Sequence, residues 1–262
     1  TVQVVPHITS AIQNWIEEVA IVPADGSGEQ PDVCVIELGG TVGDIESAPF
    51  VEALRQFQFI VGKQNICFVH VSLVPVIGPV GEQKTKPTQH TVRELRALGI
   101  TPDMLVCRSE SPLSNETREK LALFCHVGPE AVLSAHDVSN IYRVPLMLDE
   151  QGVTQMLAKK FDFELFENRA LLDEWRVMAD CVDSLEQDVN IAMVGKYTGL
   201  SDSYLSVIKA LQHASFEVGR RLVIDWIEAS ELESGTDAQT HAKAWALLEK
   251  ADGILVPGGF GD

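Results

Sequence analysis

An acidic, glycine-rich turn is the first segment of this sequence whose residue types could carry out chemistry. It runs from Glu37 to Ser47, directly after the apolar run 33–36, and holds Asp44, Glu46 and three glycines. Carboxylate oxygens suit Mg²⁺ or the hydroxyl and amine groups of a ligand, and glycine lets a ligand approach the backbone closely. An acidic surface turn is the commoner role of such a stretch, but its position after an apparent buried strand favours a binding site.

A second candidate is a basic turn from Gly81 to His90. Lys84 and Lys86 flank Thr85 there, and a predicted helix begins within two residues. Ammonium groups beside the free N–H groups of a helix N-terminus make an anion site. The chain has a formal net charge of −18, so a local pair of lysines is informative. The spacing alone supports a solvated loop that binds nothing equally well.

Other polar residues stand near the ends of predicted strands. Arg108 follows one strand, His136 and Asp137 follow the next, and Lys120 lies on the helix between them. Residues at the carboxyl ends of parallel strands converge on one rim of a sheet, so these side chains could face one ligand. Taken singly, each is explained more simply as a surface charge or a loop histidine.

A glycine turn, Pro257–Gly261, follows the last predicted strand, and its backbone N–H groups could stabilise an oxyanion. A plain turn is the commoner meaning of such a pattern. The sequence holds no GxxxxGK[ST] phosphate loop, no Ser or Cys in a nucleophile elbow, and no HxxxH or CxxC metal pattern.

The elements that must position these residues alternate along the chain, which predicts a doubly wound α/β fold with mainly parallel strands. The predicted strands cover 33–36, 68–74, 104–107, 131–134, 191–194, 222–227 and 254–256. The predicted helices cover 47–57, 88–98, 115–124, 202–218 and 237–250, and 150–188 is helical and acidic. Two α/β units joined by a helical linker are therefore expected.

Local details of two helices can also be predicted. Ser47 and Thr88 have the side chains of N-cap residues. Phe50, Leu54 and Phe57 are spaced to form one buried face of the helix 47–57.

Composition narrows the class of protein. The 262 residues include 38 acidic and 20 basic side chains, which argues against nucleic acid or an anionic membrane as the main partner. No apolar run approaches the ~20 residues that span a bilayer. The five cysteines are odd in number and widely spaced, which indicates core thiols and a cytoplasmic location.

Taken together, the motifs resemble the CTP synthase family, in family order from Thr1 to Asp262. The matching segments are Val2–Thr9, Glu37–Ser47, Gly81–His90, Asp137–Pro145, Val194–Tyr197 and Leu255–Gly261. The resemblance implies the C-terminal portion of a P-loop NTPase-like synthetase domain over 1–149, a helical linker region over 150–189, and the N-terminal portion of a class I glutaminase domain over 190–262.

The resemblance also implies a reaction. The family uses ATP and Mg²⁺ to phosphorylate O4 of UTP, and ammonia from glutamine then displaces the phosphate to give CTP, the final step of de novo pyrimidine nucleotide synthesis. GTP activates the glutaminase step, CTP is a feedback inhibitor, and the family forms homotetramers and filaments.

Residue by residue, the resemblance assigns Glu37 to magnesium, and assigns to CTP or UTP the residues Asp44, Ile45, Glu46, Lys84, Thr85, Lys86, Pro87, Thr88, Gln89 and Lys120. It assigns ATP adenine to His136, Asp137 and Val138, and the glutamine site and oxyanion hole to Gly259. Lys196 opens the glutaminase portion and is a candidate for GTP coupling.

The sequence departs from the family at both catalytic centres. The family's lysine-containing phosphate loop, its second magnesium carboxylate and its Cys-His-Glu triad have no counterpart, so no catalytic residue is assigned. The chain is therefore expected to be an internal piece of a longer enzyme and inactive alone. We also expect Glu37 and Lys84 to face each other across a cleft that holds a metal-bound triphosphate.

Two other functions remain open. The first is a non-catalytic subunit that binds pyrimidine nucleotide or joins a filament. The second is an unrelated phosphate-loop-like ATPase, against which the second α/β unit, beginning near Asn190, counts.

Overall fold

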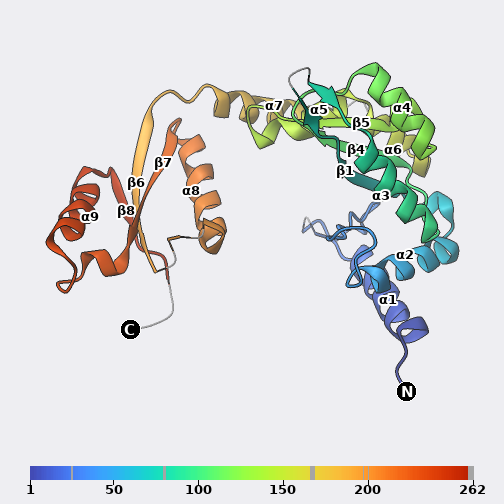
Figure 1. Cartoon of the computed structure of the whole chain (residues 1–262), viewed down its shortest axis with the longest axis horizontal. Coiled ribbons are helices and arrows are strands. Elements are labelled where there is room, and N and C mark those ends of the chain that lie inside the picture. Colours follow the sequence, from blue (N-terminus) through green and yellow to red (C-terminus); the bar gives the residue numbers. More distant parts are fainter. Residues whose placement is uncertain (25, 79–80, 166–168, 197, 200, 259–262) are drawn as a thin grey trace. The chain divides into compact units, whose positions relative to one another are not determined.

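The computed structural model describes residues 1–24, 26–78, 81–165, 169–196, 198–199 and 201–258. The chain divides into two compact units, coloured along the sequence in Figure 1. Unit 1 consists of Thr1–Val138 and Val144–Asn168, and unit 2 consists of Ser139–Arg143 and Arg169–Asp262.

Unit 1 is built on a parallel sheet with the strand order β1-β4-β5. The strands are β1 (Val69–Leu73), β4 (Met104–Ser109) and β5 (Val132–His136). Helix α3 (Lys86–Ala97) connects β1 to β4, and α4 (Asn115–Cys125) connects β4 to β5. A short antiparallel hairpin of β2 (Val76–Ile77) and β3 (Glu82–Gln83) leads into α3.

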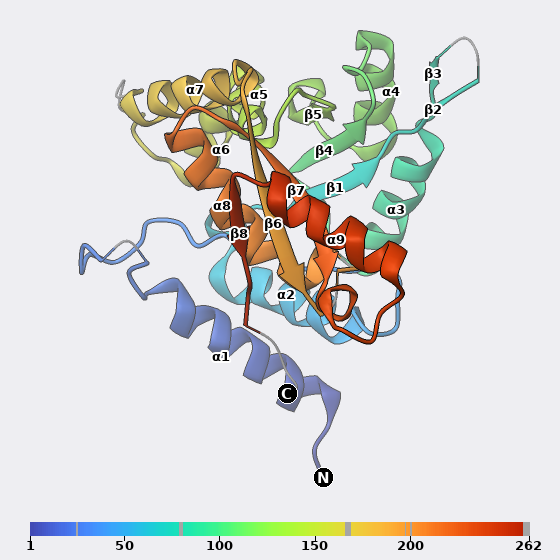
Figure 2. The ribbon, with the colours of Figure 1, turned by 90° about the vertical axis from the view of Figure 1, so that its left-hand side faces the viewer.

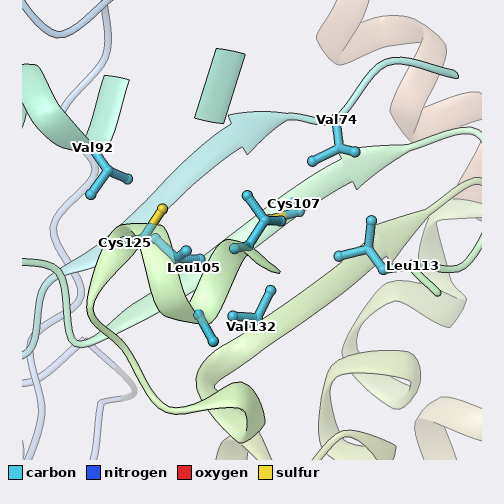
Figure 3. Close-up of a cluster of buried hydrophobic side chains, with 9 residues drawn as sticks. Val74, Val92, Leu105, Cys107, Leu113, Cys125 and Val132 are labelled. Carbon is cyan, nitrogen blue, oxygen red and sulfur yellow. The ribbon is translucent and has the colours of Figure 1, made fainter. Parts of the chain in front are cut away.

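Helices cover both faces of this sheet. Successive residues of a strand point to opposite faces, so each face has its own cluster of buried side chains. Leu105 and Cys107 of β4 pack with Val92 of α3 and Leu121 of α4, and Figure 3 shows part of this core. Met104 and Val106 belong to another cluster, which includes residues of two helices that follow β5, α5 (Val144–Glu150) and α6 (Val153–Phe161).

The N-terminal part of unit 1 is helical. Helix α1 (Thr9–Ala20) lies against α2 (Ala48–Val61), and the buried Gln13 side chain donates a hydrogen bond to the Ala53 carbonyl over 2.9 Å. Single helical turns elsewhere in the described chain cover Val4–Ile8, Lys63–Asn65, Pro129–Ala131, Ile141–Arg143, Ser201–Tyr204 and Ala229–Leu232.

Unit 2 has its own parallel sheet with the order β7-β6-β8. After α7 (Ala170–Asp183) come β6 (Asp188–Gly195), α8 (Leu205–Glu217), β7 (Arg221–Glu228), α9 (Ala238–Lys250) and β8 (Gly253–Leu255). Figures 1 and 2 show α8 and α9 on opposite faces of the sheet. The core on the α9 side contains Ala192, Val194, Ile227 and Ala244.

The predicted α/β class with parallel sheets is confirmed, but the first predicted strand is wrong. Residues 33–36 have no regular secondary structure, and Val35 and Ile36 are 91% and 49% exposed. A strand buried on both faces needs hydrogen-bonded neighbours in a sheet. No described strand pairs with this run, so its apolar composition alone does not make it a strand.

Of the two predicted N-caps, Thr88 is wrong and Ser47 is correct in position only. Ser47 stands at the N-cap of α2, but its hydroxyl donates to the carbonyls of Thr41 and Asp44 and accepts no hydrogen bond from the helix. Thr88 lies inside α3, fully buried, and its hydroxyl donates to the Leu73 carbonyl.

The predicted apolar face of the helix 47–57 is wrong at Phe50. Within α2, Val51 and Ala53 are the buried residues, whereas Phe50 is exposed. Val51 is buried against Leu95 and Ile100, whereas the carbonyl of Ala53 accepts a hydrogen bond from Gln13 of α1. None of the described helices has the length and apolar character needed to cross a membrane.

Leu105 offers a direct test of the unit 1 core. Its side chain is fully buried in the central strand β4, whereas Leu123 on α4 is 73% exposed. Leu105→Ala should lower the free energy of unfolding by about 2–5 kcal/mol because it leaves a cavity. Leu123→Ala should change it by about 0.5 kcal/mol or less. Urea unfolding of both variants measures the difference, and equal effects would contradict the assigned core.

His70 should make the stability of unit 1 depend on pH. It is buried on β1, with Nε2 2.9 Å from the Thr91 hydroxyl, and burial lowers its pKa. A histidine whose pKa is lower when folded contributes full stability above the unfolded pKa of about 6.5 and loses it as the pH falls. Between about pH 7.5 and 5.5, the wild type should therefore lose more unfolding free energy than His70→Gln. If the unfolding free energies of the wild type and His70→Gln, measured with urea, changed with pH to the same extent, His70 would not be the source of the pH dependence.

Candidate functional site

Gln83 fastens the basic turn to the start of α4. Its side-chain N–H donates to the Pro112 carbonyl over 2.9 Å, and its side-chain carbonyl accepts from the Ser114 N–H over 3.0 Å. Ser114 in turn caps α4 by accepting from the Thr117 N–H. The turn and α4, which are separate in sequence, are therefore held together.

This attachment holds Lys84 next to a residue that is bonded to the start of α4, the helix that carries Lys120. Lys84 Nζ lies 2.6 Å from a carboxylate oxygen of Glu82. The pKa of Glu82 is lowered, chiefly by the hydrogen bond from Lys84, and the charge of Lys120 on α4 contributes as well. The pair with Glu82 is substantially exposed, and an exposed ion pair of this kind is weak enough for a phosphate to replace the carboxylate.

A cavity lies beside this turn, on α3. Its volume is about 530 Å³, and it is lined by Lys86, Gln89, His90, Arg93, Arg96 and Phe124. No carboxylate is among these lining residues. Lys86 and Gln89 were assigned to nucleotide from the sequence. His90, Arg93 and Arg96 were missed, although their spacing of three residues makes each a neighbour of the next on the helix surface.

Three other predicted contact residues support the turn. Thr85 is buried, and its hydroxyl accepts a hydrogen bond from the Gln89 side chain over 3.0 Å. Thr88 is buried against β1, where its hydroxyl lies 2.9 Å from that of Ser72. Pro87 lies in the first turn of α3, where a missing N–H costs nothing. The side chains of Thr85 and Thr88 are therefore arranged to hold the lysines in place.

The acidic turn is exposed. Glu37, Asp44, Ile45 and Glu46 all lie at the surface, and the turn is closed by a hydrogen bond from the Asp44 N–H to the Thr41 carbonyl over 3.1 Å. Within the part of the chain that the structure describes, no three His, Cys, Asp or Glu residues group to hold a metal ion. Neither described cavity is lined by Glu37 or Lys84, so the predicted shared cleft stays a prediction.

The ends of β4 and β5 meet as the sequence predicted. Arg108 pairs with Asp137 over 2.7 Å and also donates to the Ala135 carbonyl over 2.7 Å. The Asp137 N–H donates to the Ser109 carbonyl, and the His136 ring lies 3.2 Å from the Ser134 hydroxyl. Val138, the last of the three residues assigned to adenine, is partly buried.

Ser109 was not identified from the sequence. It is 3% exposed, and its hydroxyl is the one buried side-chain polar atom in the described residues without a hydrogen-bond partner. It ends β4 opposite His136. A buried hydroxyl normally finds a partner, so a polar group that binds at this rim could satisfy it.

In unit 2, Lys196 follows β6, and its backbone N–H donates to the Tyr204 hydroxyl over 3.2 Å. A side chain on the preceding Gly195 would meet that hydroxyl at 2.7 Å, so only glycine fits there. Gly259 lies outside the described residues, and its predicted role stays a prediction.

Parallel sheets with helices on both faces place the chain in the class of α/β proteins. A family model described as "CTP synthase N-terminus" matches residues 1–163. The chain belongs to the CTP synthase family.

The chain is also similar to individual CTP synthases, and these matches cover its whole length. The chain is 56% identical to CTP synthase of Dictyostelium discoideum over 277 residues, which covers 100% of this chain and 49% of the relative. It is 54% identical to human CTP synthase 1 over 265 residues, covering 100% and 45%, and 54% identical to CTP synthase 1 of Saccharomyces cerevisiae over 272 residues, covering 100% and 47%. The chain therefore spans about half the length of these relatives.

Proposed function

We propose that this chain is part of an enzyme that converts UTP to CTP, using ATP, Mg²⁺ and ammonia released from glutamine. The observation that carries the proposal is a cluster of cationic side chains at the start of α3. Lys84, whose only ion pair within the described residues is with the exposed Glu82, stands two residues before Lys86. Lys86 lines a cavity together with Arg93 and Arg96. In a chain of net charge −18, such a surface suits a ligand with several negative charges, and a nucleoside triphosphate has that chemistry.

Different residues of the chain would bind different parts of the nucleotides. Lys84, Lys86 and Lys120 would hold the phosphates of UTP, or of CTP as a competing inhibitor, while Thr85 and Thr88 fix the turn. Asp44–Glu46 and Gln89 would contact the same nucleotide. His136–Val138, at the rim beside Arg108, would line the adenine of ATP.

Glu37 would be one ligand of Mg²⁺. The ion is usually held in proteins by one or two carboxylates together with substrate phosphates and water, so a single exposed carboxylate fits this role. When bound, Mg²⁺ would neutralise the charge of the ATP phosphates during transfer to O4 of UTP. Ammonia would then displace the phosphate from C4.

Each of the two units would belong to the domain that carries out one of the two reactions, CTP formation or glutamine hydrolysis. In this proposal, residues 1–149 form part of a P-loop NTPase-like synthetase domain, 150–189 a linker region, and 190–262 the start of a class I glutaminase domain. Gly259 would serve the glutamine site and Lys196 the response to GTP. The enzyme would assemble as homotetramers and filaments.

A non-catalytic nucleotide-binding or filament-forming subunit is the second candidate. A chimera separates the two. Residues 1–262 would replace the matching half of human CTP synthase 1, and CTP formation would be measured beside that of the chain alone. Activity in the chimera supports the enzyme, whereas an inactive, folded chimera that still binds UTP supports the second candidate.

In the active chimera, Glu37→Ala should lower ATP-dependent CTP formation by roughly 100-fold, because several kcal/mol of metal-ion stabilisation are lost. Glutamate release from glutamine should remain measurable. Glu249→Ala removes an exposed carboxylate from α9 and serves as the matched control. CTP formation at the wild-type rate by Glu37→Ala would remove Glu37 from the metal site.

Lys84→Ala and Lys120→Ala should each raise the UTP concentration needed for half-maximal rate by about tenfold or more, because each loses a charge-assisted hydrogen bond. The control is Lys250→Ala, which removes an exposed ammonium group at the end of α9. Steady-state rates over a range of UTP concentrations provide the measurement. An unchanged dependence of the rate on UTP concentration in both variants would show that the two lysines do not bind UTP.

A further inference from the structure

The two ring nitrogens of His136, at the end of β5 in unit 1, have different surroundings. Nδ1 lies 3.2 Å from the hydroxyl of Ser134, two residues earlier on the same strand. Nε2 has no hydrogen-bond partner among the described residues, and the side chain is partly exposed. The protein therefore holds one nitrogen of the ring, and the other can bond to a ligand at this rim of the sheet.

Ser134 is fixed by hydrogen bonds to its backbone and to its side chain. Its N–H donates to the side-chain carbonyl of Gln151 over 2.8 Å, and its own carbonyl accepts from the Gln151 amide over 2.9 Å. Arg118 donates to the same Gln151 oxygen over 2.8 Å, which holds this amide in place. The Ser134 hydroxyl accepts from the Leu113 N–H over 3.1 Å, and the residue is 1% exposed. Ser134 therefore has a well-defined position.

The direction of the hydrogen bond between Ser134 and His136 follows from the other bond of the hydroxyl. A serine hydroxyl has one hydrogen to donate, and a buried hydroxyl normally donates it. This hydroxyl already accepts from Leu113, and Nδ1 is the only acceptor that the described residues place within its reach. A neutral imidazole that accepts at Nδ1 carries its proton at Nε2. His136 consequently offers an N–H donor at the rim.

We propose that Ser134 is a positioning residue for nucleotide binding: it holds the His136 ring so that Nε2–H donates to an acceptor atom of the bound base. A purine has such acceptors in its unprotonated ring nitrogens. A donor that is oriented before binding spares the ligand the cost of ordering it. The identity of the base as the adenine of ATP rests on the proposed function, whereas the orientation of the His136 ring can be tested on the chain alone.

The first test is ¹⁵N nuclear magnetic resonance of the His136 ring in the full 262-residue chain, at a pH where the imidazole is neutral. The ring signals are assigned from their loss in His136→Gln. In the wild type, Nδ1 should be an unprotonated nitrogen that accepts a hydrogen bond, and Nε2 should carry the proton. The opposite tautomer would overturn the proposal, and this result requires no variant of Ser134.

Ser134→Ala should move the Nδ1 resonance downfield, because an unprotonated ring nitrogen is less shielded when it accepts no hydrogen bond. Ser134→Thr keeps the hydroxyl and should keep the wild-type resonance. Ser109→Ala is the matched control, because it removes a buried hydroxyl that stands opposite His136 on β4 but has no hydrogen-bond partner in the described residues. An unmoved Nδ1 resonance in folded Ser134→Ala would overturn the proposal.

The second test uses the active chimera. Ser134→Ala should raise the KM for ATP about fivefold, which corresponds to the loss of one ordinary hydrogen bond, with little change in the KM for UTP. Ser134→Thr should recover most of the loss. Ser215→Ala, which removes a buried hydroxyl that bonds within α8, should change neither KM.

Analogues of ATP that lack one ring nitrogen separate recognition of the base from a merely structural effect of Ser134. One of 1-deaza-, 3-deaza- and 7-deaza-ATP should have a KM about fivefold above that of ATP in the unmodified chimera but not in Ser134→Ala, because the same hydrogen bond is lost only once. Absence of this coupling for all three analogues would overturn the role in nucleotide binding. An unmodified chimera that forms no CTP would contradict the proposed function instead, and the ring resonances would still decide whether Ser134 orients His136.

Discussion

The parallel pairing of β1, β4 and β5 is the constraint on which the candidate site depends. Parallel strands end on the same rim, so loops that are far apart in the sequence meet there. The register sets Arg108 opposite Ala135 and Ser109 opposite His136, which explains how the Arg108 guanidinium reaches both a β5 carbonyl and Asp137. Loss of this pairing would separate the residues assigned to adenine from those that hold them.

Polar side-chain contacts fix the loops beside the sheet. Gln83 ties the basic turn to the start of α4, the helix that carries Lys120. Gln83 has no proposed ligand contact of its own, yet it fixes the position of a turn that is proposed to bind nucleotide. The chain belongs to the CTP synthase family and is 54–56% identical to CTP synthases over its whole length.

Much of the fold follows from the sequence, because alternation of apolar runs and amphipathic stretches is a local property. The prediction of a strand at 33–36 was wrong because a strand also needs a hydrogen-bonded neighbouring strand, which composition does not reveal. The predicted cap hydrogen bonds are absent for a related reason: Ser47 and Thr88 use their hydroxyls for carbonyls nearby or on β1. Within the candidate site, the family resemblance identified the lysines. No motif identifies Arg93 and Arg96, which were found because they line a cavity, or Ser109, which was found because its buried hydroxyl has no hydrogen-bond partner.

A crystal structure of the chimera with UTP and Mg²⁺ would examine the nucleotide-binding role of the lysines most directly. Phosphate oxygens of UTP should lie within hydrogen-bond distance of Nζ of both Lys84 and Lys120, with Lys84 turned away from Glu82. UTP bound elsewhere, with Lys84 still paired to Glu82 and Lys120 in solvent, would contradict it.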